Sequence, residues 1–495
     1  MSGVSTTKYL LPSDKFEFVT KPYQHQIESF NYAATYEKFL LGDEQGLGKT
    51  KQAIDIAVYR KKVYGLKHCL IVCGVNSLKF NWVEEIITHS NESSMILGTR
   101  IGKRGKVYVG GSVRTRLEDL IEVEKGNIDD YFLITNIETL RNPQIQEKLR
   151  QLTENGTIGM VIIDEIHKAK NPESKQGLSI HCLQSYFRLA LTGTPLMNNP
   201  IDLYNILKWL EVYNGTFYSF RHRYCEMGGR GGYGIVGYKN LFELRRYYEK
   251  VELRRKKEDV LDLPPKIRTI EYVEMTPKQA QLYQEVRECI LANIHQIKLN
   301  PNTLAQLIRL RQVTGHTAIL SRTIRESAKV NRLKEMLKEV VENGRKALVF
   351  SNWVNMVDIL AEELKEYNPA IITGKTKDID AEKYRFQNDD DCKIAIGTIG
   401  VMGTGHTLTA ASYVFFVDKP WNFANTIQAE DRAHRIGSEF PVQSITLVCK
   451  DTIDERIEEI IAEKAELMEG LIEGDEDIIE RLNIETDELV DRLLS

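Results

Sequence analysis

Short hydrophobic runs alternate with helix-like stretches along most of the chain. Several runs are continuous and rich in β-branched or aromatic residues, which is typical of strands buried on both faces of a parallel sheet. They occupy residues 39–42, 69–73, 132–135, 160–164 and 189–192 in the first half, and 347–351, 371–373, 394–397, 413–418 and 445–449 in the second. Because strands and helices alternate in two series, the pattern predicts an α/β protein with two lobes.

A different pattern separates the two series, between residues 213 and 330. Glycines cluster at 228–234, and helical periodicity returns at 277–297 and 302–314. We interpret this region as a helical insertion and inter-lobe linker. The predicted organisation is a first lobe over residues 1–212, the insertion over 213–330, a second lobe over 331–450 and an acidic helical tail over 451–495.

The composition fits a globular protein rather than a disordered or membrane-spanning one, with 42% hydrophobic and 27% charged residues among 495. The longest apolar stretches are far shorter than the roughly 18–20 residues that span a membrane. No apolar leader follows Met1, so we expect no secretory signal and a cytoplasmic protein. The short stretches before the phosphate loop and after the last motif fit a prokaryotic or viral setting. The seven cysteines form no Cys-x-x-Cys pair, so we expect reduced thiols and no structural zinc site.

Charge is unevenly distributed, although the net value is only −4. Residues 451–495 carry 17 acidic and 4 basic side chains, which leaves a balance of +9 on the rest of the chain. A basic body is compatible with a polyanion partner. The alternative is that the acidic tail is a solvated helical face that closes the fold.

A glycine-rich segment follows the first predicted strand and precedes a helical pattern at 52–59. The segment reads Gly-Asp-Glu-Gln-Gly-Leu-Gly-Lys-Thr from Gly42 to Thr50, and this strand–loop–helix context is what a phosphate-binding loop requires. Lys49 would reach the β- and γ-phosphates, and the Thr50 hydroxyl would hold Mg²⁺. The strict loop pattern has glycine where Asp43 stands, so a chance turn is the alternative.

Two carboxylates end a later apolar run, at Asp164 and Glu165. Asp164 suits a Mg²⁺ ligand, and Glu165 is positioned to orient and deprotonate the attacking water. Taken alone, such a pair is often a solvated strand edge, but a phosphate loop upstream favours function. His167 is expected to link this site to neighbouring elements, the alternative being a packing residue.

Four segments in order resemble the Swi/Snf family of helicase superfamily two. They are Asp43–Thr50, the Asp-Glu-Ile-His at 164–167, the Leu-Thr-Gly-Thr-Pro at 191–195, and the Gln-Ala-Glu-Asp-Arg-Ala-His-Arg-Ile-Gly at 428–437. Aspartate at position 43 is usual for that family. The sequence at 253–266 resembles the family's inter-lobe signature, and residues 349–353 resemble motif IV. Gly403 to Leu408 lacks the asparagine that motif V usually carries. Together with the Gln-Ala-Glu-Asp-Arg at 428–432, this resembles the annealing-helicase branch more than the nucleosome remodellers.

The resemblance implies two RecA-like lobes with parallel sheets that hydrolyse ATP between them. It implies that Gln24 recognises adenine and that Arg432 and Arg435 are arginine fingers from lobe 2; from spacing alone, either arginine is equally a surface ion-pair former. The implied catalytic residues are Glu165, Lys49, Arg432 and Arg435; the implied nucleotide contacts are Gln24, Asp43, Gly46, Leu47, Gly48, Lys49, Thr50 and Gly405; and the implied Mg²⁺ ligands are Thr50 and Asp164. Thr192 and Thr194 would couple hydrolysis to DNA, or else are turn residues.

Nucleic-acid contacts are less specified by the sequence. The family uses sequence-independent phosphate contacts from both lobes. Candidates are Lys79, Thr135, Asn136, Ser351, Asn352, Trp353 and Thr398, although such residues also serve as caps or core. The strongest basic run, residues 245–257, has seven basic and two acidic residues and is either a nucleic-acid surface or a solvated helical face.

The expected function is an ATP-dependent double-stranded-DNA translocase that acts as a monomer, takes double-stranded or forked DNA, and remodels DNA structures or DNA–protein complexes. The alternatives are a strand-separating DNA or RNA helicase and a nucleotide-gated DNA-binding scaffold with weak hydrolysis. The combination of Lys49, Glu165, Arg432 and Arg435 argues against the scaffold, which has no need of a water-activating carboxylate.

Overall fold

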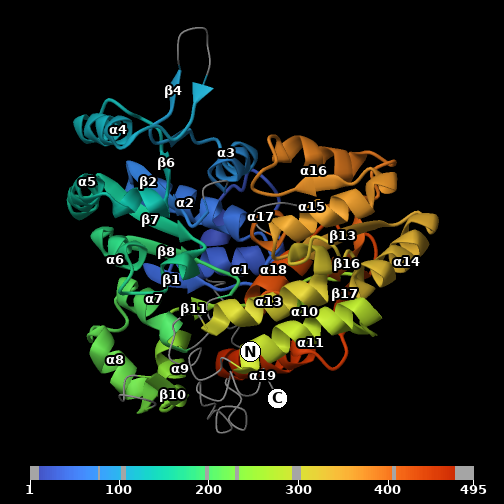
Figure 1. Cartoon of the computed structure of the whole chain (residues 1–495). Coiled ribbons are helices and arrows are strands. Elements are labelled where there is room, and N and C mark those ends of the chain that lie inside the picture. The colour runs from blue at the N-terminus through green and yellow to red at the C-terminus, as the bar shows by residue number, and fades with distance from the viewer. Residues whose placement is uncertain are drawn as a thin grey trace, which may run out of the picture. The chain divides into compact units, whose positions relative to one another are not determined.

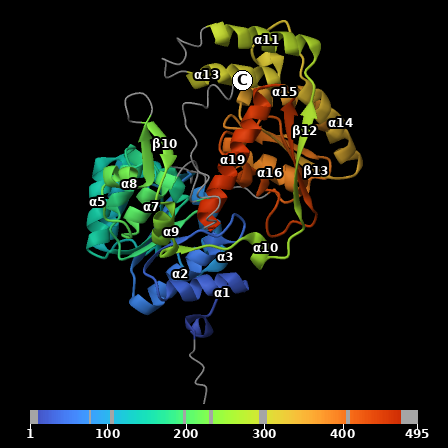
Figure 2. The same cartoon turned by 90° about the horizontal axis from the view of Figure 1, so that it is seen from below.

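The computed structural model describes residues 11–75, 78–101, 107–194, 200–228, 234–292, 303–403 and 408–473. They form two compact units, of which the first includes residues 11–228 and 237–261 and the second includes residues 262–469 (Figures 1 and 2). The region from 213 to 330, expected as one insertion, is thus divided between the units after Leu261. None of the seven cysteines, all within the described residues, forms a disulfide.

The first unit is built on a seven-stranded sheet in the order β11-β1-β8-β7-β2-β6-β3, and every pairing in it is parallel. Its strands are β1 (Lys38–Leu41), β2 (His68–Cys73), β3 (Ser94–Ile96), β6 (Phe132–Asn136), β7 (Ile158–Asp164), β8 (Phe187–Leu191) and β11 (Glu252–Leu253). Outside the two main sheets there are two two-stranded sheets. One is the antiparallel pair of β4 (Arg100–Ile101) and β5 (Val107–Tyr108), and the other joins β9 (Cys225–Gly228) and β10 (Gly234–Tyr238).

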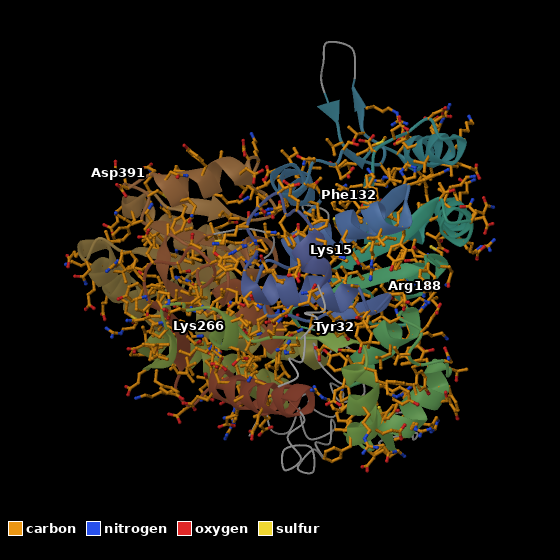
Figure 3. The ribbon with its side chains drawn as sticks, turned by 180° about the vertical axis from the view of Figure 1, so that it is seen from behind. Lys15, Tyr32, Phe132, Arg188, Lys266 and Asp391 are labelled. Carbon is orange, nitrogen blue, oxygen red and sulfur yellow. The ribbon has the colours of Figure 1, made fainter. Side chains whose placement is uncertain are left out.

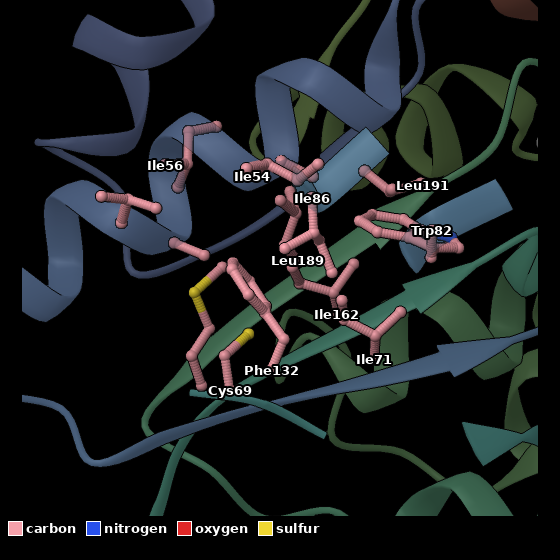
Figure 4. Close-up of a cluster of buried hydrophobic side chains, with 14 of the residues drawn as sticks. Ile54, Ile56, Cys69, Ile71, Trp82, Ile86, Phe132, Ile162, Leu189 and Leu191 are labelled. Carbon is pink, nitrogen blue, oxygen red and sulfur yellow. The ribbon is translucent and has the colours of Figure 1, made fainter. Parts of the chain in front are cut away.

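Helices follow most of these strands, as the alternation of patterns predicts. They are α1 (Gln24–Ala33), α2 (Lys49–Tyr64), α3 (Leu78–His89), α4 (Val113–Lys125), α5 (Pro143–Glu154), α6 (Lys175–Ser179), α7 (Tyr204–Trp209), α8 (Phe217–Tyr224), α9 (Leu241–Glu249) and α10 (Lys257–Val260). One core cluster joins α2 and α3 to the sheet, and Figure 4 shows Ile54 and Trp82 from the helices beside Ile71, Ile162 and Leu189 from the strands. This packing fixes the strand ends from which the candidate site projects.

The second unit has a six-stranded parallel sheet in the order β12-β17-β16-β13-β15-β14. The strands are β12 (Lys266–Val273), β13 (Lys346–Ser351), β14 (Ala370–Ile372), β15 (Ile394–Thr398), β16 (Ala411–Phe416) and β17 (Val442–Cys449). The helices are α11 (Pro277–Ala292), α13 (Thr303–Gly315), α14 (Ala328–Glu342), α15 (Val354–Glu363), α16 (Ile379–Asn388), α17 (Ile399–Met402), α18 (Phe423–Glu430) and α19 (Ile453–Glu473). Two separate core clusters cover the two faces of the sheet.

Helix α19 confirms the helical start of the predicted tail. Its isoleucines Ile453, Ile457 and Ile460 are buried against α11 and α13. Near its first turn the Asp454 carboxylate forms a buried ion pair with Lys329 of α14, at 2.6 Å. The first part of the tail therefore closes the fold of the second unit, while residues 474–495 lie outside the described part of the chain.

All ten hydrophobic runs are strands, which confirms the predicted α/β class with two parallel sheets. Among the strands of the two main sheets, the pattern did not reveal β3, β11 and β12. Strand β11 has only two residues. Strand β12 is an edge strand with exposed residues on both faces, including Ile267 and Tyr272, so it has no buried hydrophobic side to read. No helix in the described ranges is long and apolar enough to cross a membrane.

Candidate nucleotide site

The phosphate loop joins β1 to α2 in the first unit. Gly46 and Gly48 have φ angles of 89° and 72°, in the left-handed region that favours glycine. A Cβ atom at Gly48 would also lie 2.6 Å from the Gln26 side-chain nitrogen. The loop leads directly into the first turn of a 16-residue helix, whose N-terminal amides suit an anion.

Lys49 lies within this loop rather than in solvent. Its amine donates hydrogen bonds to the backbone carbonyls of Asp43, at 2.7 Å, and Glu44, at 3.1 Å. Burial lowers the pKa of the Lys49 amine, while the charges of Glu165, Asp43 and Asp164 act in the opposite direction. The structure therefore brings the loop lysine and both carboxylates of the acidic pair within electrostatic reach of one another.

Asp164 is the last residue of β7, and its carboxylate accepts a hydrogen bond of 3.0 Å from the Trp82 indole. Burial and the neighbouring Glu165 raise the pKa of Asp164 to about 7. Two carboxyl groups that share a buried site disfavour each other's ionisation. A cation or a phosphate-bound metal ion at this position would remove that penalty.

Glu165 has a φ angle of 51°, a left-handed conformation that is uncommon for residues other than glycine. Its carboxylate accepts a hydrogen bond of 3.3 Å from the Gln45 side chain, and its other oxygen lies 3.2 Å from Nδ1 of His167. The loop and the short helical turn Ile166–Ala169 thus hold this carboxylate from two sides. Such strain at a candidate catalytic residue indicates that its direction is fixed by the surrounding structure.

Two glycines permit the close approach of these elements. A Cβ atom at Gly74 would lie 2.8 Å from the Asp164 carbonyl oxygen and 2.9 Å from the Glu165 side chain. At Gly193 it would lie 3.2 Å from the Lys49 amine. The close contact of Gly74 with the acidic pair explains why a residue without a Cβ atom stands here.

His167 is fully buried and contacts Thr192, which follows β8. Nδ1 of the imidazole lies 2.9 Å from the Thr192 hydroxyl oxygen, and that oxygen also accepts a hydrogen bond from the Thr194 amide. Burial lowers the pKa of His167 to about 4, so the ring is neutral near pH 7. The acidic pair is therefore linked to residues 192–194, as expected for His167; Pro195 lies outside the described residues.

A Mg²⁺ ion bound with phosphates needs few protein ligands, since it keeps several waters and takes one or two carboxylates. The residues fit that requirement: Thr50 offers a hydroxyl in the first turn of α2 and Asp164 offers a carboxylate. Within the described ranges there is no group of three or more His, Cys, Asp or Glu residues that could hold a metal on its own. The site thus suits a nucleotide-bound ion rather than a structural metal.

The glutamine in contact with the loop differs from the one that the resemblance selects. Gln24 is exposed at the start of α1, whereas Gln26 is buried and donates to the Leu47 carbonyl at 3.4 Å. Gln52 on α2 also donates to that carbonyl, at 3.0 Å. No sequence signal separates Gln26 and Gln52 from other glutamines. Adenine recognition by Gln24 stays a prediction, and Gly405 lies outside the described residues.

The two candidate arginine fingers belong to the second unit and follow α18. The Arg432 guanidinium donates to the Gln428 carbonyl at 3.0 Å, and the Arg435 amide donates to the Ser438 hydroxyl at 3.0 Å. Just before them, the buried Glu430 carboxylate pairs with Lys266, labelled in Figure 3, at 3.2 Å and with Arg268 at 2.7 Å. Nothing in the sequence indicated these two ion pairs of Glu430, which connect the end of α18 to β12.

Most candidate nucleic-acid contacts have internal partners or are buried. The Ser351 hydroxyl and the Asn352 side chain both donate to Asp418, at 2.6 Å each. Asn136 accepts from Thr139, and Trp353 packs against the core of the second unit. The remaining candidates, Lys79, Thr135 and Thr398, are 4%, 1% and 7% exposed. These side chains serve the fold first, and their contact with nucleic acid stays a prediction.

The basic run at residues 245–257 also contributes to the first unit rather than forming only a solvated face. Arg254 donates to the Gly42 carbonyl at 3.1 Å, and Arg255 forms an ion pair of 2.7 Å with Asp43. Both arginines therefore contact the beginning of the phosphate loop. Sequence spacing gave no indication of this, because 212 positions separate Asp43 from Arg255.

The parallel sheets, the phosphate loop and the carboxylate pair define a nucleotide-hydrolysing protein of the helicase type. More particularly, the chain belongs to the SNF2-related domain family, which matches residues 23–319 and is followed by a helicase conserved C-terminal domain at residues 328–437. The two matched domains identify it as an ATP-hydrolysing enzyme with two RecA-like lobes.

Curated relatives and a solved structure are similar to the chain. An "Uncharacterized ATP-dependent helicase" of Mycoplasma pneumoniae is 29% identical, with 90% of this chain and 41% of the relative covered. The "DNA annealing helicase and endonuclease ZRANB3" of Mus musculus is 28% identical, with 88% and 39% covered. The "Sulfolobus solfataricus SWI2/SNF2 ATPase core in complex with dsDNA" has 26% identity and a TM-score of 0.41, with 97% of this chain and 98% of that chain covered. The chain spans less than half the length of these two curated relatives.

Proposed function

We propose that this chain is a DNA-stimulated ATPase that translocates along double-stranded DNA and remodels DNA structures or DNA–protein complexes. The observation that carries the proposal is the convergence of Lys49 with Asp164 and Glu165 at the strand ends of the first unit. Family membership supports the same conclusion, and a relative is named a DNA annealing helicase.

The residues of this site suit phosphoryl transfer to water. Lys49 would exchange its contacts with the Asp43 and Glu44 carbonyls for the β- and γ-phosphates of ATP. Glu165, held by Gln45, would orient the attacking water and take its proton. A Mg²⁺ ion held by Thr50 and Asp164 would neutralise charge on the phosphates.

Arg432 and Arg435 would complete the site when the second lobe closes on the nucleotide. Charge develops on the γ-phosphoryl oxygens during hydrolysis, and a guanidinium supplied by closure stabilises it. The anchoring of Glu430 by Lys266 and Arg268 supports this role, because it fixes the end of α18 from which Arg432 follows. Hydrolysis that depends on closure is a means of driving movement along DNA.

The test is ATP hydrolysis measured without nucleic acid and with single-stranded DNA, duplex DNA, forked DNA or RNA, using Lys49→Ala and Glu165→Gln as controls. Duplex or forked DNA should stimulate hydrolysis by about tenfold or more, and both substitutions should abolish the stimulated rate. A second assay follows displacement of a triplex-forming strand, which a duplex translocase removes without separating the duplex.

The other outcomes discriminate the remaining functions. Stimulation by single strands or RNA alone, with separation of a forked duplex, would establish a strand-separating helicase in place of a duplex translocase. A rate near background with every nucleic acid, despite ATP binding, would favour a nucleotide-gated scaffold.

Arg432→Ala and Arg435→Ala should lower the stimulated rate by about 10³-fold while leaving ATP binding largely intact.

A further inference from the structure

The segment that connects the two units first runs along the phosphate loop. The Leu40 amide donates to the Val251 carbonyl at 2.7 Å, the Gly42 amide to the Leu253 carbonyl at 2.8 Å, and the Glu44 amide to the Arg255 carbonyl at 3.1 Å. These bonds extend the parallel β1–β11 pairing beyond the end of the strand and into the loop. The connecting segment therefore holds the backbone with which the phosphate loop begins.

Arg255 adds a side-chain contact at the same point. Its guanidinium donates two parallel hydrogen bonds to the Asp43 carboxylate, from Nε to Oδ1 at 2.9 Å and from Nη2 to Oδ2 at 2.7 Å. It also donates to the His25 carbonyl, the Ser29 hydroxyl and the Gln52 amide oxygen. A forked, two-bond pair of this kind fixes direction as well as distance.

Asp43 requires such a partner. The residue is 0% exposed, and a buried carboxylate is costly unless it is paired and hydrogen-bonded. Its Oδ2 atom also accepts from Gln52 at 3.1 Å, and the same Gln52 amide group donates to the Leu47 carbonyl at 3.0 Å. One network thus runs from Arg255 through Asp43 and Gln52 to the middle of the loop.

The network bears directly on Lys49. The Lys49 amine donates to the carbonyls of Asp43 and Glu44, the two residues that Arg255 and its backbone hold. In addition, the Lys257 amide donates to the Glu44 carboxylate at 2.9 Å. A change at Arg255 would therefore alter both the first turn of the loop and the position of its lysine.

We propose that Arg255 is a positioning residue of the nucleotide site, which through Asp43 holds the phosphate loop in its nucleotide-binding shape from the connection between the two lobes. The proposal goes beyond the function above because it assigns Arg255 to the nucleotide site without any contact to nucleic acid. It rests on nucleotide binding at the phosphate loop, which the unchanged protein tests separately.

The experiment is a double-mutant cycle on the full chain, read as the dissociation constant of a fluorescent ADP in the absence of nucleic acid. The variants are Arg255→Met, Asp43→Asn and the double substitution, with Arg255→Lys as the conservative variant. Arg255→Met should weaken binding by about tenfold or more, and the double variant should bind more tightly than the product of the two single effects predicts. Arg255→Lys should recover part of the affinity, because a lysine supplies the charge without the fork.

The matched control is Arg114→Met on α4, since that side chain is 88% exposed and its ion pair with Glu118 lies within one helix. For each variant we would also measure the urea midpoint of unfolding, and the Michaelis constant for ATP separately from kcat. Binding by Arg255→Met within twofold of the unchanged protein, or independent effects of the two substitutions, would overturn the proposal. If Arg255→Met fails to fold, unchanged affinity in Asp43→Asn and Arg255→Lys together would overturn it. Failure of the unchanged protein to bind the nucleotide would instead overturn the proposed function.

Discussion

The imidazole of His167 lies 2.9 Å from the hydroxyl of Thr192, and the two side chains join the ends of β7 and β8. The same ring nitrogen is 3.2 Å from the Glu165 carboxylate. The buried His167 side chain therefore contacts both the candidate catalytic base and Thr192, which follows β8. Because its two neighbours are oxygen atoms, we assign the proton of the neutral ring to Nδ1. A movement of residues 192–194 would therefore change the position of the Glu165 carboxylate through His167.

Removal of the Thr192 hydroxyl should uncouple hydrolysis from nucleic acid more than it impairs nucleotide binding. Thr192→Val is expected to lower DNA stimulation by about tenfold, within the usual range of coupling between two sites, and to leave ADP affinity within about twofold. Thr192→Ser keeps the hydroxyl and should retain most of the stimulation. Steady-state rates with and without duplex DNA measure the effect; equal losses of basal and stimulated rate would contradict it.

A methyl group at Gly74 should displace the acidic pair. Gly74→Ala would place its Cβ atom 2.8 Å from the Asp164 carbonyl oxygen and 2.9 Å from Glu165, closer than these atoms tolerate. We expect kcat to fall by about tenfold or more, since small displacements of catalytic groups are costly. Gly374→Ala is the control, because a Cβ atom there meets nothing within 4 Å. A normal kcat with a raised Michaelis constant would argue against displacement of Glu165.

Loss of the Glu430 carboxylate should destabilise the second unit. Burial alone would raise the pKa of Glu430, but Lys266 and Arg268 outweigh it and the pKa is lowered. Glu430→Gln is expected to cost about 3 kcal/mol in the free energy of unfolding, because Lys266 and Arg268 both lose this buried carboxylate, although Lys266 keeps its 3.2 Å ion pair with Asp431. Since the folded pKa is depressed, the pair stabilises above the ordinary carboxylate pKa and this contribution disappears as the pH falls through the folded pKa. Urea unfolding near pH 7 and pH 3 measures both effects; an equal cost at the two pH values would contradict the pairing.

Glu252 should give the free energy of unfolding of the first unit the opposite pH dependence. Burial raises the pKa of this carboxyl from 4.5 to about 7, and its neighbour Tyr248 donates a hydrogen bond to it. The folded chain then holds a proton that the unfolded chain releases, so the contribution is full below pH 4.5 and is lost as the pH rises through about 7. Glu252→Gln should remove about 2 kcal/mol of this pH-dependent change. Chemical unfolding between pH 5 and 8 tests it, and parallel stability curves for the two proteins would show the prediction to be wrong.

Local pattern was sufficient for the central parts of this protein. The ten predicted strands coincide with short hydrophobic runs, several of them continuous, so their prediction needed no knowledge of their neighbours. The phosphate loop and the Asp164–Glu165 pair are likewise contiguous, and their chemistry follows from residue type beside a strand end. The sequence alone thus determined the α/β class, the family and the candidate residues for phosphate and water.

Tertiary structure decided how those residues are held. Arg255 meets Asp43 across 212 positions, and Arg268 meets Glu430 across 162. Gln26 contacts the loop while Gln24 is exposed, a difference set by which side of α1 faces the core. Such partners are chosen by parallel strands that bring distant segments together, and no periodicity along the chain records that choice.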